Sequence, residues 1–311
     1  MRGTITAFLA IAFFSLYFVF AKLLLANISP FIIMVLNQAT AGIIIILILD
    51  LFKKISEIKN TSKYDFKSIF VISIFTAVVG PTLFLFGLDY SSATNAILIG
   101  KSEALITSLL AIIMLKERIT KQQIIGGVIM FLGVIIIATK NFSSGLRLEL
   151  GDTLIFFAAV SYATGTVLFK KYVDHLPPEV IVTLRNLYGA IILFVISLMF
   201  VDYSTVLQII SLKFVLVFLG MVIFVTIFGQ YLWYRALEAT SATKVSLAGL
   251  SSPLIAIVYA IIFLDERLVS SQMLGGALIM AGLIILELHF RKTYTHKRHK
   301  FHLKLKHWHH I

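Results

Sequence analysis

A duplicated segment constrains the fold of this chain more than any other feature of its sequence. Residues Leu88–Ile137 align without a gap with residues Leu237–Leu286, 149 positions further on, and 21 of the 50 aligned residues are identical. A Ser-Ala-Thr triplet, a Glu-Arg pair and a Gly-Gly pair recur in both copies. Identity at this density indicates an internal duplication, so we expect two copies of one structural unit.

Both copies lie in a chain that is too apolar to cover a water-soluble surface. Hydrophobic residues make up 59% of the 311 residues and charged residues only 14%, whereas about 25% of a typical soluble protein is charged. A membrane-spanning helix needs about 20 mostly apolar residues, and the sequence offers ten such windows in succession. The predicted spans are 4–26, 30–52, 67–88, 92–115, 121–139, 151–172, 178–201, 212–236, 241–264 and 270–290.

The number of spans in each half predicts how the two copies are related. Each half holds five predicted spans, and an odd number makes the second half enter the membrane from the opposite side. We therefore predict an all-α integral membrane protein with ten transmembrane helices in two inverted five-helix repeats. The expected parts are a first repeat at 1–140, a linker at 141–150, a second repeat at 151–290 and a basic, histidine-rich tail at 291–311.

The distribution of lysine and arginine predicts the orientation in the membrane. If the amino terminus is cytoplasmic, the inside segments hold Arg2, the five lysines between positions 53 and 67, and the basic tail, whereas the outside segments hold few basic residues. By the positive-inside rule, both termini are then cytoplasmic. The duplicated loop agrees, because Lys116 of the first copy is replaced by Asp265 on the predicted outer face. We expect a multi-pass protein of the plasma membrane.

The two copies resemble the EamA repeat of the drug/metabolite transporter superfamily. The resemblance covers nearly the whole chain and implies a ten-helix permease for amino acids, nucleotide sugars, organic cations or other metabolites, which works by alternating access. One departure is Ala104, because the repeat commonly places a proline there, as the second copy does at Pro253. A helix break is therefore less expected in the first half. The matching segments are Ala93-Thr94, Glu117-Arg118 and Gly126-Gly127 in the first copy, and Ala242-Thr243, Pro253, Glu266-Arg267 and Gly275-Gly276 in the second.

Lys101 and Glu103 are the most unusual residues within the predicted spans. Ionisable groups in hydrocarbon cost at least about 2.5–3.5 kcal/mol each, so they normally face a cavity or a partner. The aligned residues of the second copy are Leu250 and Ser252, so the duplication itself does not require these charges. Residues two apart lie about 200° apart around a helix. We expect Lys101 to face the substrate and attract a carboxylate or phosphate, and Glu103 to be an inter-helix partner or a proton-responsive group; the alternative is a buried polar network without a transport role.

Further polar and aromatic residues at membrane depth are candidates for the substrate path. Arg185 and Asn186 of the seventh span align with Asn37 and Gln38 of the second span at an offset of 148. Arg185 either pairs with Glu103 or binds an anionic group. The other candidates are Tyr17, Tyr162, Gln230 and Trp233, although Trp is also typical of membrane interfaces.

Two sets of duplicated residues are interpreted as structural. The Glu-Arg pairs, Glu117-Arg118 and Glu266-Arg267, stand at helix ends, and Pro253 marks a helix break. Glycine faces allow the backbones of two membrane helices to approach closely. Gly126 and Gly127 in the fifth span, with Gly275 and Gly276 in the tenth, therefore indicate scaffold helices and a candidate contact in a homodimer.

Several functional classes find no support in the sequence. Without cysteine there is no thiolate metal or redox site, and the histidine spacing of the tail matches no defined metal site, so we expect the tail to lie near anionic lipid. Gly100-Lys101-Ser102 imitates the end of a phosphate loop, but Asn95 replaces the glycine that such a loop requires. No catalytic motif is present. We predict neither an enzyme, nor a cofactor or metal, nor a nucleic-acid partner.

The pattern predicts a secondary transporter of small polar metabolites, and the resemblance implies amino acids or related organic solutes in the first place. Inverted repeats are typical of such transporters, with a substrate cavity near the midplane between the repeats. A coupled proton is a candidate partner. The alternatives are an exchanger of organic phosphates or nucleotide sugars, and a receptor or assembly protein that shares the fold without transporting, because fold does not determine function.

Overall fold

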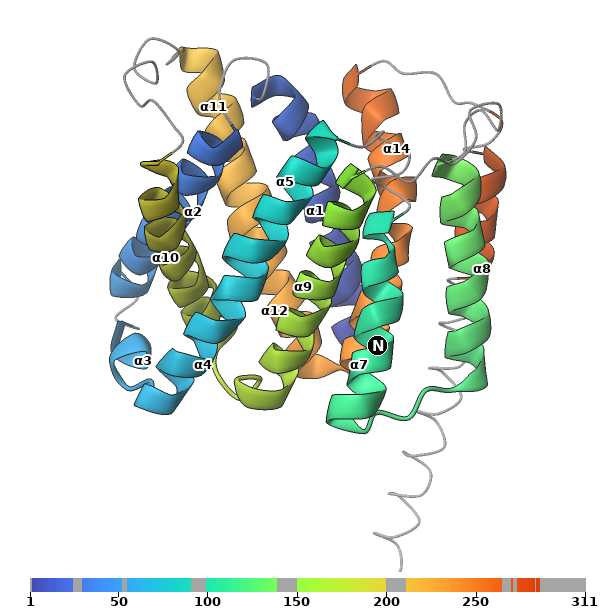
Figure 1. Cartoon of the computed structure of the whole chain (residues 1–311), viewed down its shortest axis with the longest axis horizontal. Coiled ribbons are helices and arrows are strands. Elements are labelled where there is room, and N and C mark those ends of the chain that lie inside the picture. The colour runs from blue at the N-terminus through green and yellow to red at the C-terminus, as the bar shows by residue number, and fades with distance from the viewer. Residues whose placement is uncertain are drawn as a thin grey trace, which may run out of the picture.

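Helices form almost all of the described structure. The computed structural model describes residues 2–24, 30–51, 55–90, 99–138, 150–199, 211–264, 270, 273–282 and 284–285, and no strand occurs among them. Figure 1 shows the helices packed side by side in one bundle. The predicted all-α fold is confirmed. The tail at 291–311 lies outside the described residues.

The helices of the first repeat follow the predicted spans closely. Five apolar helical segments run from Arg2 to Ala138, joined by short connections. The third segment changes from α-helix to π-helix and back without a gap. The elements are α1 (Arg2–Leu24), α2 (Pro30–Leu51), the short α3 (Ile55–Lys59), α4 (Lys63–Ser73), η1 (Ile74–Val79), α5 (Gly80–Asp89), α7 (Ser102–Leu115) and α8 (Lys121–Ala138).

The described helices of the second repeat follow in the same order, although none of them corresponds to the short α3. The third segment of this repeat also contains a π-helix, and its fourth contains a 3₁₀ turn. The elements are α9 (Leu150–Tyr172), α10 (Pro178–Ser197), α11 (Leu212–Gly220), η3 (Met221–Gly229), α12 (Gln230–Ala239), α13 (Ala242–Ala248), η4 (Gly249–Ser251), α14 (Ser252–Leu264) and a last helix at Met273–Gly282.

Five of the described helical segments are long and apolar enough to cross a membrane. They are Phe31–Leu51, Lys63–Gly87, Leu150–Tyr172, Pro178–Ser197 and Leu212–Ala239. Shorter apolar helices occupy Gly3–Tyr17, Ser102–Leu115, Lys121–Ile136 and Met273–Gly282. The predicted integral membrane protein is confirmed by this arrangement.

The packing of the helices is symmetric between the repeats. α2 packs against α10, its own counterpart in the other half. α5 packs against α9 as α12 packs against α1, and α7 packs against α9 as α14 packs against α1. Exchange of the two repeats leaves this set of neighbours unchanged, so a pseudo-two-fold axis relates the halves. With five spans in each half, this is the predicted inverted repeat.

Glycines bring α8 and the last helix into close contact. A Cβ atom on Gly133 would lie 2.6 Å from the carbonyl oxygen of Gly275, and a Cβ on Gly282 would lie 2.7 Å from the carbonyl oxygen of Gly126. The two contacts are exchanged by the pseudo-two-fold axis. The glycine faces of the fifth and tenth spans thus meet within one chain, and a homodimer stays a prediction.

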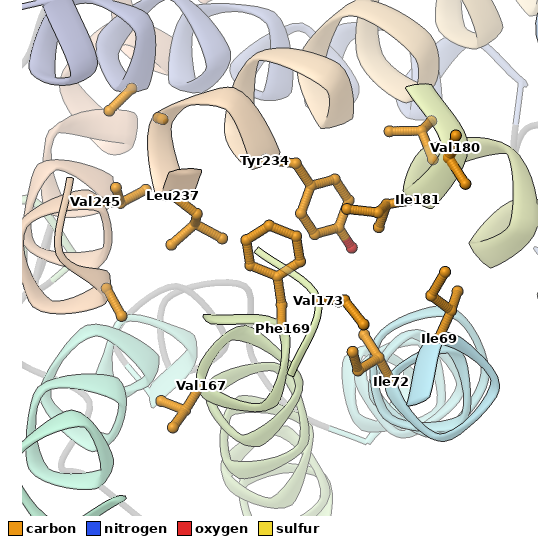
Figure 2. Packing of buried hydrophobic residues seen from close by; sticks show 14 of the residues in the cluster. Ile69, Ile72, Val167, Phe169, Val173, Val180, Ile181, Tyr234, Leu237 and Val245 are labelled. Carbon is orange, nitrogen blue, oxygen red and sulfur yellow. The ribbon is translucent and has the colours of Figure 1, made fainter. Parts of the chain in front are cut away.

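The largest apolar core joins the two repeats at one end of the bundle. Figure 2 shows Phe169 of α9 facing Tyr234 of α12, with Ile72 and Ile181 beside them. The ring centroids of Phe169 and Tyr234 are 4.7 Å apart. All four side chains are buried. Because burial of such side chains is strongly favourable, this core holds α12 against the end of α9.

Candidate functional site

Two helices are interrupted at equivalent positions of the two repeats. Gly100 is helical, Lys101 lies in a turn, and α7 begins at Ser102, whereas in the second repeat η4 separates α13 from α14. The aligned serines make the same local bond. Ser102 Oγ donates to the Ile99 carbonyl at 2.6 Å, and Ser251 Oγ donates to the Ala248 carbonyl at 2.7 Å.

These interruptions correct one expectation from the sequence. A break seemed less expected in the first half because Ala104 stands where the second copy has Pro253. The structure has an interruption in both halves, since the shared Gly-x-Ser turn produces it without proline. Interrupted helices at membrane depth are typical of transporter binding sites.

The π-helices η1 and η3 are a second pair of equivalent irregularities. Gly80 follows η1 and Gly229 ends η3, and both lie against an aromatic ring of the opposite repeat. A Cβ on Gly80 would lie 2.9 Å from Tyr162 Cε1, and a Cβ on Gly229 would lie 2.8 Å from Phe14 Cε1. π-segments occur frequently at functional sites because they displace side chains and backbone groups from the regular helix.

Lys101 connects the two repeats. Its Nζ donates a hydrogen bond to Ser252 Oγ, at the start of α14. The carbonyl of Ser252 in turn accepts a bond from Ser15 Oγ of α1 at 3.3 Å. Lys101 and Ser252 are half-buried. The ammonium group therefore sits between three helices and has a neutral hydroxyl as its partner.

Glu103 lies in the first turn of α7 and is half-buried. Within the described part of the chain, its carboxylate has no hydrogen-bond partner and forms no salt bridge with Lys101 or Arg185, but it interacts electrostatically with Lys101. The Glu103 carboxylate lies close enough to Tyr162 of α9 to interact with it electrostatically. Tyr17 and Arg185 also interact electrostatically with Tyr162. Tyr17 and Tyr162 are half-buried. The structure thus brings Glu103 and Arg185 into one electrostatic neighbourhood around Tyr162.

Arg185 is bound to neutral groups of η1. Its Nε donates to Thr76 Oγ1 at 2.9 Å, and Nη2 donates to the Thr76 carbonyl at 2.6 Å. Nη1 donates to Asn186 Oδ1 at 3.3 Å. Only 8% of the Arg185 surface is exposed. The structure shows no salt bridge between Arg185 and Glu103, which was one of the two alternatives expected for Arg185, because the π-segment supplies the acceptors instead. Binding of an anionic group by Arg185 stays a prediction.

The counterparts of Arg185 and Asn186 in the first repeat form an equivalent set of contacts. Thr226 Oγ1 of η3 donates to Asn37 Oδ1 at 2.6 Å, and Gln38 Nε2 donates to the Ala77 carbonyl of η1 at 3.0 Å. In the second half, Asn186 Nδ2 donates to Gln230 Oε1 at 3.0 Å. Asn37, Gln38, Arg185, Asn186 and Gln230 thus form polar contacts between the second and third segments of both repeats.

Trp233 lies apart from these polar contacts. It is half-buried on α12, with its ring centroid 5.9 Å from that of Phe14. Its role in the substrate path stays a prediction.

The residues predicted to be structural have different environments. The Glu117 carboxylate contacts the start of α13, whereas Arg118 is exposed. Pro253 is buried in the first turn of α14. Gly127 and Gly276 lie against Leu247 and Leu254. Glu266 and Arg267 lie outside the described residues.

Three polar partners were missed at the level of the sequence. Ser252 bonds Lys101, Thr76 bonds Arg185, and Thr226 bonds Asn37. The sequence contained a hint for Ser252 only. Ser252 aligns with Glu103, so it stands at a position that is charged in the other copy. Thr76 and Thr226 had none, since isolated threonines are common in apolar helices.

Comparison with known families identifies the fold that carries this site. The EamA-like transporter family matches residues 1–139 and 149–288, which is nearly the whole chain and includes both copies of the duplication. The chain belongs to the EamA-like transporter family. This family comprises transporters rather than enzymes, as the sequence predicted. The EamA-like chain is therefore a multi-pass membrane protein of transporter type.

Individual relatives agree with the family. An uncharacterized transporter of Archaeoglobus fulgidus is 28% identical over 288 residues, 92% of this chain and 98% of the relative. An uncharacterized transporter of Synechocystis is 25% identical over 241 residues, 75% of this chain and 68% of the relative. A protein of Escherichia coli named a probable amino-acid metabolite efflux pump is 30% identical over 205 residues, 61% of this chain and 66% of the relative.

A solved structure shares the fold of the EamA-like chain. The TM-score is 0.80 with 16% sequence identity, and the match covers 94% of this chain and 98% of the other. At this level of identity the likeness concerns the fold alone.

Proposed function

We propose that this EamA-like protein moves small zwitterionic metabolites, in the first place amino acids, by alternating access between its two repeats. One observation carries the proposal. Lys101, Glu103 and Arg185 lie within or beside apolar helices, yet none of them forms a salt bridge with another of the three, although the charges of Lys101 and Glu103 interact electrostatically. Lys101 and Arg185 bond to neutral groups, and the Glu103 carboxylate has no hydrogen bond or salt bridge among the described residues.

Charged groups within apolar helices that share no salt bridge favour a charged ligand. Because each costs at least about 2.5–3.5 kcal/mol in hydrocarbon, such groups usually pair with one another or serve a pathway. A hydroxyl is a weaker partner for an ammonium group than a carboxylate is. A ligand that carries a carboxylate and an ammonium group complements both the cationic side chains and Glu103. An amino acid has this pattern, and the name of the Escherichia coli relative is consistent with it.

The mechanism follows from the position of these groups on both repeats. Lys101 belongs to the first repeat and its partner Ser252 to the second. A ligand carboxylate that takes the Lys101 ammonium from Ser252 would change the contact between the repeats, and any coupled ion must bind one state better than the other. In this scheme the substrate occupies a cavity between the repeats near the midplane, and Glu103 is the candidate site for a coupled proton.

A second candidate substrate class is supported by the charge count. Two cationic groups against one carboxylate leave an excess of positive charge, which suits organic phosphates or nucleotide sugars.

The distribution of basic residues favours cytoplasmic termini and a location in the plasma membrane. Anionic lipid at the tail and a homodimer are further proposals.

A thermal-shift screen in detergent tests the substrate class. A ligand present at about 100 times its dissociation constant stabilises a protein by about 2.7 kcal/mol. We expect amino acids to raise the melting temperature of the wild type and of Lys171→Met, a surface lysine control, but not of Lys101→Met. A shift with organic phosphates alone would favour the second candidate. Stabilisation of Lys101→Met equal to that of the wild type would refute the site.

A further inference from the structure

Glu117 makes the most extensive polar contact between the two repeats in the described structure. Its carboxylate accepts bonds from the backbone N–H groups of Ala242 and Thr243 at 2.9 and 3.3 Å, and from Thr243 Oγ1 at 2.8 Å. Glu117 follows the end of α7, and Ala242 and Thr243 begin α13. Carboxylates stabilise the amino-terminal ends of helices because they complement the unpaired N–H groups there. The contact is named the Glu117 latch.

The neighbouring turn between α12 and α13 is held by a second charged group. Lys170 Nζ donates to the Leu237 carbonyl at 2.7 Å and pairs with Asp174 at 3.1 Å. Lys170 therefore binds the carboxyl-terminal end of α12 instead of extending to the membrane surface as a snorkelling lysine does. Gly3 of α1 packs against Ala239 in the same turn. The start of α13 is thus held at the end of the bundle where α1 begins.

The backbone beside Glu117 is strained. Lys116 has a φ of 54°, and it is the only non-glycine residue with a positive φ among the described residues. The Glu117 N–H closes this turn on the Ala111 carbonyl at 3.1 Å. A left-handed residue with a side chain persists only where its surroundings enforce it, and such residues cluster at switch regions. The turn directs Glu117 from α7 to α13.

The latch and the Lys101 contact hold the same two segments at different depths. Lys101 lies directly before α7 and Glu117 just beyond its end. Both side chains bond to the segment from α13 to α14, Lys101 to Ser252 and Glu117 to Ala242. Between the contacts, Thr107 on α7 is 0% exposed and Ser246 on α13 is 3% exposed. Neither hydroxyl has a hydrogen-bond partner. Buried hydroxyls without partners disfavour the arrangement in which they are buried, so each is a sensitive place to detect opening of these segments.

We propose that Glu117 is a positioning residue of the transport cycle, whose bonds to Ala242 and Thr243 close one end of the substrate path. This inference rests on the proposed function. Release of the carboxylate from α13 opens that end and frees the segment that presents Ser252 to Lys101. The sequence repeats both partners of the contact, since Glu266 aligns with Glu117 and Ala93-Thr94 aligns with Ala242-Thr243.

The test uses the absence of native cysteine, which makes labelling of a single introduced cysteine specific. Ser246→Cys and Thr107→Cys are placed in separate proteins and exposed to a membrane-impermeant maleimide from the amino-terminal side. Each is combined with Glu117→Gln, or with the control Glu238→Gln, a carboxylate in the same region that pairs with Arg235 within α12. We expect Glu117→Gln to raise the labelling rate at least about tenfold, and Glu238→Gln to leave it unchanged.

Two results decide the proposal, and a second variant covers a failure to fold. Faster labelling with Glu117→Gln, together with an altered KM or kcat of transport, supports a latch. Unchanged labelling in both cysteine proteins overturns it, even if the melting temperature falls, because a lower melting temperature alone indicates an ordinary helix cap. If Glu117→Gln does not fold, Thr243→Ala removes one of the three bonds and must raise labelling in the same direction. Labelling needs no substrate, so the latch is tested separately from the amino-acid assignment.

Discussion

Lys101 and Ser252 are 151 positions apart, and the ammonium of one donates a hydrogen bond to the hydroxyl of the other. The bond joins the interrupted helices of the two repeats. Ser252→Ala removes this acceptor from a cationic group within apolar helices. Hydrogen bonds to charged groups contribute about 1.5–3 kcal/mol, and because Lys101 is partly accessible we expect a loss of about 1.5 kcal/mol, seen as a lower melting temperature in detergent. Ser246→Ala, whose hydroxyl has no partner, is the control. Equal losses in the two variants would argue against the bond.

The glycine contact between α8 and the last helix makes Gly133 intolerant of any side chain. In Gly133→Ala the added Cβ would lie 2.6 Å from the backbone oxygen of Gly275, so the helices must separate. Overpacking typically costs about 1–3 kcal/mol. Gly249→Ala is the matched control, because nothing lies within 4 Å of its Cβ position. We expect a lower melting temperature for Gly133→Ala alone; a neutral result would show that the two helices are further apart than described.

Thr76 stabilises the fold through Arg185. Thr76→Val removes the hydroxyl that accepts from Arg185 Nε, and a bond to a charged group contributes about 1.5–3 kcal/mol. In an Arg185→Met background the same substitution should have a clearly smaller effect, because the charge that needs the acceptor is gone and only the bond from Thr76 Oγ1 to the Ile72 carbonyl is lost. Melting temperatures of the four proteins measure the coupling. Additive losses would mean that Thr76 acts independently of Arg185.

Lys116→Gly should stabilise the protein, unlike most substitutions of lysine by glycine. The left-handed backbone at Lys116, with a φ of 54°, costs a residue with a side chain about 1–2 kcal/mol. Glycine removes that cost but gains freedom in the unfolded chain, so we expect a net gain of about 0.5–1 kcal/mol. Lys116→Ala keeps the strain and serves as the control. A melting temperature that falls with Lys116→Gly contradicts the strained turn.

The sequence alone determined the class and symmetry of this protein. Ten apolar windows predict helices that span a membrane. In lipid no water is present to bond the backbone N–H and C=O groups, and a long apolar segment satisfies them within itself when it is a helix. The duplication at an offset of 149 residues, with five spans in each half, predicted the inverted repeats, and the duplicated glycines predicted close helix contacts. These features depend on local composition and spacing, which the linear sequence contains.

Only the tertiary structure decided which polar groups meet. The spacing of Lys101 and Glu103 placed them on different faces of one helix, but it could not say that Ser252 lies opposite Lys101. The π-segments likewise leave no mark in a uniformly apolar sequence, so the capture of Arg185 by Thr76 was not predictable. Partners between helices depend on the rotation and register of each helix against its neighbours. Those are set by packing of the whole bundle rather than by local sequence.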